Sequence, residues 1–127
     1  MKLIVLDSGP LGLLVHDKSF AVAEACQSWM RATLQSGVRL AIPEVVDYEI
    51  RRELLRLSKR KSVLRLDTLR LLDGVHFLPI TTAVMHRAAE LWAESRASGR
   101  PTADPKALDI DVILAATIHV YGGAQHR

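Results

Sequence analysis

The sequence predicts an α/β fold in which a central parallel sheet lies between two layers of helices. Short apolar runs, typical of buried strands, alternate with longer segments whose apolar residues recur at helical spacing. The chain has 127 residues, of which 49% are hydrophobic and only 5% aromatic. This length and composition suit one compact domain with an aliphatic core. We therefore expect a single domain over residues 1–127.

Glycine, proline and hydroxyl residues separate the predicted strands and helices along the chain. Apolar runs predict strands at 2–6, 38–42 and 75–80. Helical spacing predicts helices at about 10–15, 19–36, 43–57, 62–72, 81–99 and 109–122. Ser19 and either Thr81 or Thr82 are the expected N-caps of two helices, and Gly37 and Gly99 are expected to follow helix ends.

Three bulky or reactive side chains lie within the predicted helical stripes. Cys26 is the only cysteine, which excludes an internal disulfide and is typical of a reducing compartment. It falls in a stripe with Val22 and Trp29, so we expect a buried structural thiol. Trp29 and Trp92 are both interpreted as core residues. Because no apolar run approaches the roughly 20 residues of a membrane span, we expect a soluble, cytoplasmic protein.

The charge balance permits a polyanionic partner but does not require one. Lys and Arg number 17, against 14 Asp and Glu. The densest basic stretch comprises Arg51, Arg52, Arg56 and residues 59–61. It reads either as a solvated helix face or as a path for an RNA backbone. The five histidines show no paired spacing for zinc, and no glycine-rich phosphate loop follows the first strand.

Acidic residues end the first strand and follow the second. Asp7 closes the first apolar run, where it can be a turn residue or a carboxylate held at the carboxyl end of a central strand. Glu49 lies about two turns into the helix that Pro43 opens. Glu44 and Asp47 are competing carboxylates on the same helix, near an N-terminus that favours negative charge for other reasons.

Two further carboxylates, Asp109 and Asp111, lie at the start of the last predicted helix. Asp109 is the better N-cap candidate. If both were inside the helix they would point about 200° apart, so only one could face a given site. Three carboxylates at one edge of a parallel sheet would suit Mg²⁺ or Mn²⁺, and such a site supports phosphodiester hydrolysis by a metal-activated water.

The segments LIVLDSGPLGLL, IPEVVDYEIRREL and DVILAAT resemble, in order and spacing, the three motifs of PIN domains. Bacterial VapC-type toxins of toxin–antitoxin pairs are the most similar kind, and the resemblance covers about residues 2–120. It implies that Asp7, Glu49 and Asp111 are the metal-binding carboxylates. It also implies that Asp109 is a fourth candidate and that Ser8 fills the small hydroxyl position after the first Asp.

The resemblance further implies a PIN-like three-layer sandwich and Mg²⁺- or Mn²⁺-dependent endoribonuclease activity. A small antitoxin partner and a homodimer are expected on the same ground. Ser8, Arg51 and Arg52 are the candidate RNA contacts, the two arginines because they lie just beyond Glu49. PIN domains usually continue into another strand with a last acidic position, whereas this chain ends at GGAQHR, so we expect the C-terminal strand to be missing. Two alternatives stay open: a catalytically inactive PIN-like module that binds RNA or a protein, and a phosphoacceptor receiver domain.

Overall fold

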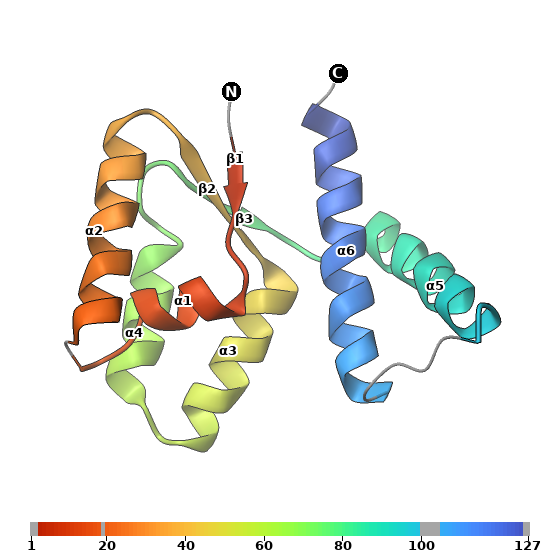
Figure 1. Cartoon of the computed structure of the whole chain (residues 1–127), viewed down its shortest axis with the longest axis horizontal. Coiled ribbons are helices and arrows are strands. Elements are labelled where there is room, and N and C mark those ends of the chain that lie inside the picture. Colours follow the sequence, from red (N-terminus) through yellow and green to blue (C-terminus); the bar gives the residue numbers. More distant parts are fainter. Residues whose placement is uncertain (1–2, 19, 100–104, 126–127) are drawn as a thin grey trace. The chain divides into compact units, whose positions relative to one another are not determined.

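The computed structural model describes residues 3–18, 20–99 and 105–125 (Figure 1). Within these residues, three strands and six helices follow one another as β1 (Leu3–Val5), α1 (Ser8–Leu14), α2 (Ala21–Gln35), β2 (Arg39–Pro43), α3 (Glu44–Arg56), α4 (Arg60–Leu69), β3 (Val75–Leu78), α5 (Thr82–Ala97) and α6 (Pro105–Gln125). The predicted α/β class is confirmed. The chain divides into two compact units, residues 1–77 and 78–127.

A three-stranded sheet of order β1-β2-β3 forms the centre of the first unit. β1 and β2 pair in parallel, with Val5 opposite Ala41. The Leu6 amide continues this pairing by donating to the Ala41 carbonyl at 2.9 Å, and the Leu40 amide donates to the Gly74 carbonyl at the start of β3. The predicted parallel sheet is confirmed. Among the described strands, however, β2 is the central one, so the prediction that the first strand is central was wrong.

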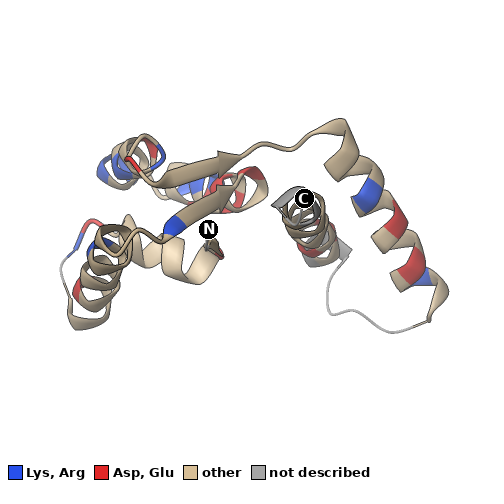
Figure 2. Ribbon diagram, turned by 90° about the horizontal axis from the view of Figure 1, so that it is seen from above, with Lys and Arg blue, Asp and Glu red and all other residues tan. Residues whose placement is uncertain are grey.

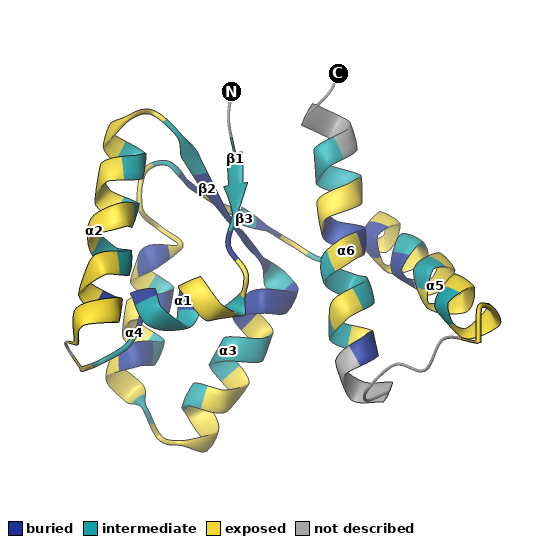
Figure 3. Cartoon of the chain, in the orientation of Figure 1, coloured by how far each residue is buried: buried dark blue, intermediate teal, exposed yellow. Residues whose placement is uncertain are grey.

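Helices α1 to α4 pack on one another, and α2 and α3 pack on β2. α1 contacts α2 and α3, while α3 contacts α4 and β2. The closeness of α1 to α3 is clear at Gly12, where an added Cβ would lie 3.6 Å from Ile50 Cδ1. Figure 3 shows the buried centre along β2 and the start of α3. The fully buried side chains of this unit include Leu6, Leu11, Leu40, Ile42, Val45, Val46 and Leu66.

Several helix boundaries in the first unit differ from the predictions. α1 begins at Ser8 rather than Pro10, because Asp7 caps it. The N-cap of α2 is Phe20, and the predicted cap Ser19 lies outside the described residues. α4 begins at Arg60, two residues before the prediction, because the chain reverses at Ser58, whose φ of 56° is in the left-handed region.

The second unit is built from α5 and α6, which pack against each other. Of the two predicted caps, Thr81 and Thr82, the structure has Thr81, whose side chain accepts a hydrogen bond from the Val84 amide at 3.2 Å. Val84, Ala88 and Ala116 form the buried centre of this unit. The Tyr121 hydroxyl donates to the Pro79 carbonyl at 2.7 Å and ties the end of α6 to the residue after β3.

α6 is longer at both ends than the sequence predicted. It starts at Pro105, one turn before Asp109, because proline is well tolerated in the first turn of a helix. It also continues through Gly122 to Gln125, although the glycine pair predicted its end. β3 is shorter than predicted and ends at Leu78, before Pro79, which has no amide hydrogen to donate to a sheet.

The interpretation of both tryptophans as core residues was wrong. Trp29 and Trp92 are 40% and 41% exposed, while the small residues Ala23 and Ala88 occupy the buried positions of α2 and α5. Cys26 is half-buried rather than buried, and its thiol donates to the Pro10 carbonyl at 3.7 Å. Burial raises the pKa of this thiol. Among the described helices, none is both long and apolar enough to span a membrane.

Candidate active site

Asp7 stands at the carboxyl end of β1 and caps α1. Its Oδ1 accepts a hydrogen bond from the Ser8 amide at 2.7 Å, and its side chain is exposed. The structural role in the turn, one of the two roles that the sequence allowed for Asp7, is therefore observed. It does not exclude a second role, because a capping carboxylate with one oxygen held by a backbone amide still presents ionised oxygen to the solvent. Ser8, the first residue of α1, is half-buried.

Glu49 lies in the second turn of α3 and is half-buried. Each helical residue turns by about 100°, so Glu49 projects about 200° from Asp47 and from Arg51. Arg51 contacts Asp67 on α4, and Asp47 pairs with Arg51, as described below. Glu49 therefore projects from the side of α3 opposite Arg51, which contacts α4, and about 100° from Ile50, which lies near Gly12 of α1.

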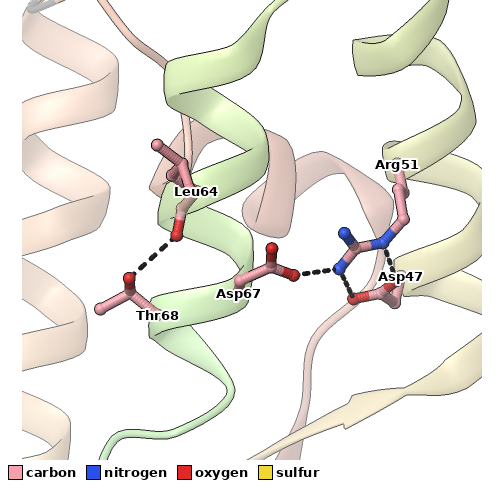
Figure 4. A network of polar contacts seen from close by, with 5 residues as sticks. All are labelled: Asp47, Arg51, Leu64, Asp67 and Thr68. Atoms are coloured by element: carbon pink, nitrogen blue, oxygen red, sulfur yellow. Dashed lines mark hydrogen bonds and ion pairs between the residues drawn. The ribbon is translucent and has the colours of Figure 1, made fainter.

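Arg51 links two carboxylates from neighbouring helices (Figure 4). Its Nε donates to Asp47 Oδ1 at 2.9 Å and its Nη2 to Asp47 Oδ2 at 3.2 Å, both within α3. Nη2 also donates to Asp67 Oδ1 on α4 at 2.7 Å. The hydrogen bonds to Asp47, and then those to Asp67, raise the pKa of Arg51. We call these three residues the α3–α4 ion-pair network.

The network bears on the roles that the sequence suggested for Asp47 and Arg51. Asp47 is only 7% exposed and bound in a bidentate pair, which favours Glu49 over Asp47 as a ligand for an added cation. Arg51, a predicted RNA contact, has two of its three guanidinium nitrogens engaged with these carboxylates. The sequence did not point to Asp67, because it lies 16 residues from Arg51 and on another helix.

The other basic side chains of this stretch differ in the groups that their charges contact. Arg56 pairs with Glu53, which lowers the pKa of that carboxyl, and Lys59 Nζ lies 3.9 Å from an oxygen of Asp17. Arg52 instead lies over the ring of Tyr48, with its Cζ 5.1 Å from the ring centroid. Figure 2 shows this mixture of signs on the helices.

Asp109 and Asp111 both lie inside α6, so the prediction that Asp109 is an N-cap was wrong. Asp109 lines an apolar groove of about 410 Å³ between α5 and α6, together with Met85, Trp92 and Val112 among others. Asp111 is exposed and projects about 200° away from Asp109. As the helical geometry predicted, the two carboxylates cannot serve the same site.

The four carboxylates provide the oxygen donors that hard divalent cations prefer. Asp7 and Glu49 belong to the first unit, and Asp109 and Asp111 belong to the second. Within the described part of either unit, no three His, Cys, Asp or Glu side chains are close enough to hold a metal ion together. Carboxylate oxygens are the donor type that Mg²⁺ or Mn²⁺ takes, but the described residues of neither unit assemble such a site alone.

Comparison with known proteins assigns the family. The family model of the PIN domain matches residues 4–124, across both units, and the chain belongs to the PIN domain family. A comparison with curated protein sequences gives no match.

Two solved structures share the fold. The structure of Mycobacterium tuberculosis VapC20, a sarcin-ricin loop cleaving toxin, has a TM-score of 0.66 and 15% identity, covering 95% of this chain and 84% of that one. A chain of VapBC2 from Rickettsia felis, bound to a DNA fragment from its promoter, has a TM-score of 0.64 and 12% identity, covering 91% and 80%. At this identity the likeness shows the fold alone.

Proposed function

We propose that this protein is a Mg²⁺- or Mn²⁺-dependent endoribonuclease and the toxin component of a toxin–antitoxin pair. The observation that carries the proposal is Asp7, an exposed carboxylate fixed at the carboxyl end of β1 in a chain of the PIN family. Ligands of parallel sheets bind beyond this end of the strands. The fold shared with VapC20 supports an RNA substrate.

Asp7, Glu49 and Asp111 are the proposed ligands of the ion, through carboxylate oxygens. When bound, a divalent ion supplies a water of lowered pKa and neutralises charge that develops at phosphorus. The Ser8 amide fixes one oxygen of Asp7 and so limits the rotation of that carboxylate. Asp109 is the weaker candidate, because its groove position on α6 opposes that of Asp111.

Ser8 and Arg52 are the proposed RNA contacts. Ser8 neighbours Asp7, and Arg52 is exposed three residues after Glu49, which makes the two residues neighbours on the helix surface. We assign Arg51 to the α3–α4 ion-pair network rather than to the RNA, since its charge is balanced by Asp47 and Asp67.

The proposed partners are a small antitoxin protein and a second copy of the chain, in the cytoplasm. The support is the likeness to a chain of VapBC2, a complex bound to its promoter DNA. Co-expression with a candidate small antitoxin, followed by size-exclusion chromatography with light scattering, gives the mass and stoichiometry of the complex. A monomer that forms no complex would contradict this part of the proposal.

The experiment for the activity compares the wild type with Glu49→Gln on unstructured RNA, in Mg²⁺, in Mn²⁺ and in EDTA. Gln keeps the size and helix propensity of Glu but removes the ionised oxygen. We expect metal-dependent cleavage by the wild type and at least about 100-fold slower cleavage by the variant, since even outer-shell changes cost 10- to 100-fold. RNA binding without cleavage by the wild type would favour the inactive PIN-like module.

A further inference from the structure

An aromatic ring and a guanidinium form an exposed pair on α3. Tyr48 is 53% exposed, and Arg52, one turn later, places its Cζ 5.1 Å from the centroid of the Tyr48 ring. Residues four apart are neighbours on a helix surface, so the helix itself brings the two side chains together. The four-residue spacing from Tyr48 to Arg52 is visible in the sequence, but Tyr48 was not among the candidate site residues predicted from it.

The pair differs from the other basic side chains of α3 in what it contacts. Arg51 is bound by Asp47 and Asp67, and Arg56 by Glu53. Within the described residues, Arg52 meets an aromatic ring and pairs with no carboxylate within 4.0 Å. Its charge and the uncovered part of the ring therefore both remain available to a ligand.

The pair also lies next to the proposed metal ligand on α3. Arg52 follows Glu49 by three residues, and positions three apart are adjacent on a helix. Tyr48 immediately precedes Glu49 and neighbours Arg52 from the turn before. A ligand held by Tyr48 and Arg52 would thus lie beside Glu49, on a part of α3 that neither α4 nor the buried core occupies.

An exposed aromatic ring beside an unpaired guanidinium has a recognised chemistry. Unpaired bases stack on aromatic rings and on arginine planes, while the arginine charge attracts the adjoining phosphate. Bases in a duplex are covered by their neighbours and cannot stack on a side chain.

We propose that Tyr48 and Arg52 form a stacking site for one unpaired base of the RNA next to the bond that is cut. This inference rests on the proposed function. It restricts the substrate to single-stranded segments and loops. Because every base has an aromatic face, the site selects for an unpaired nucleotide rather than for a particular base.

The test measures binding of a fluorescein-labelled single-stranded RNA by fluorescence anisotropy in EDTA, where the proposed metal dependence predicts no cleavage. We expect Tyr48→Leu to weaken binding by about tenfold, the size of effect that loss of one stacked base produces, and Tyr48→Phe to bind within about twofold of the wild type. Arg52→Gln should weaken binding and also reduce its salt dependence. Thermal melting of each variant confirms that it is folded.

A matched control exists on α5. Trp92 is also exposed, and Arg96 lies over its ring with its Cζ 5.3 Å from the ring centroid, on a helix without a proposed RNA contact. Trp92→Leu should bind single-stranded RNA like the wild type. Equal losses in Trp92→Leu and Tyr48→Leu would overturn the proposal, because they would show binding without a defined site.

The remaining outcomes separate this inference from the proposed function. If the wild type cleaves RNA with metal but Tyr48→Leu keeps wild-type affinity, the stacking site is wrong and the nuclease stands. If the wild type neither binds nor cleaves RNA, both are wrong. A folded Tyr48→Leu that loses self-association but not RNA affinity also overturns the stacking site, since Tyr48 would then contact a second copy.

Discussion

Arg51 Nη2 lies 2.7 Å from Asp67 Oδ1, and this ion pair joins the helix that carries Glu49 to α4. The same guanidinium binds the nearly buried Asp47 through two hydrogen bonds. Removing one partner of a buried ion pair leaves the other charge without compensation, whereas an exposed pair contributes little. Loss of Arg51 and loss of Asp67 should therefore lower the free energy of unfolding by different amounts, and this difference can be measured.

Arg51→Met should lower the free energy of unfolding by about 2–3 kcal/mol, because it strands the Asp47 carboxylate; the value is below the usual range for buried pairs since Arg51 is 28% exposed. Asp67→Asn should cost no more than about 1 kcal/mol, because Asp67 is half exposed. Urea denaturation followed by circular dichroism gives both values. Glu53→Gln, which breaks the exposed pair with Arg56 on the same helix, is the control and should leave the urea midpoint unchanged.

Asp109 and Asp111 should respond differently to the loss of charge. Asp111→Asn should slow metal-dependent cleavage by at least about 100-fold, as expected for a direct ligand, while Asp109→Asn should stay within about threefold of the wild type. The reason is that the two side chains point about 200° apart on α6. Single-turnover rates at several Mn²⁺ concentrations measure both effects. The reverse order would assign the metal to Asp109.

Cys26 should react slowly with alkylating reagents in the folded protein. Burial raises the pKa of its thiol, so a smaller fraction is thiolate at any pH below that pKa than in a free cysteine. The rate with iodoacetamide should rise with pH, but its midpoint should lie at higher pH than that of N-acetylcysteine. Mass spectrometry gives the rates, and urea should remove the difference. A folded-state midpoint at or below the free value would contradict this account.

The sequence sufficed to predict the elements whose local chemistry is self-contained. The apolar run before Asp7 and the cap at Thr81 needed only neighbouring residues, and both are confirmed. Periodicity alone misplaced Trp29 and Trp92. It identifies a stripe of apolar residues, but the close approach of neighbouring elements selected small residues such as Ala23 and Ala88 for burial.

The site residues also divide into those that the sequence predicted and those whose roles depend on contacts between helices. Asp7 was predicted from its place after the first strand, and the resemblance to the PIN motifs singled out Glu49 on α3; their metal-binding roles stay predictions. The assignment of Arg51 depended on a partner that sequence reasoning could not supply, since Asp67 meets it only after α3 and α4 fold together. Tyr48 was a different case. Its four-residue spacing to Arg52 was visible in the sequence, and only the exposure of its ring had to come from the structure.

The central claim is that the Asp7 carboxylate binds a catalytic cation, and Asp7→Asn tests it most directly. Asparagine caps helices about as well as aspartate, so α1 should keep its start and the melting temperature should change little. The measurement is the single-turnover rate of RNA cleavage as Mn²⁺ is titrated from an EDTA-treated protein. We predict a saturable Mn²⁺ dependence in the wild type and cleavage slower by at least about 100-fold in Asp7→Asn. A folded Asp7→Asn that cleaves at the wild-type rate, or wild-type cleavage that persists in EDTA, would contradict the claim.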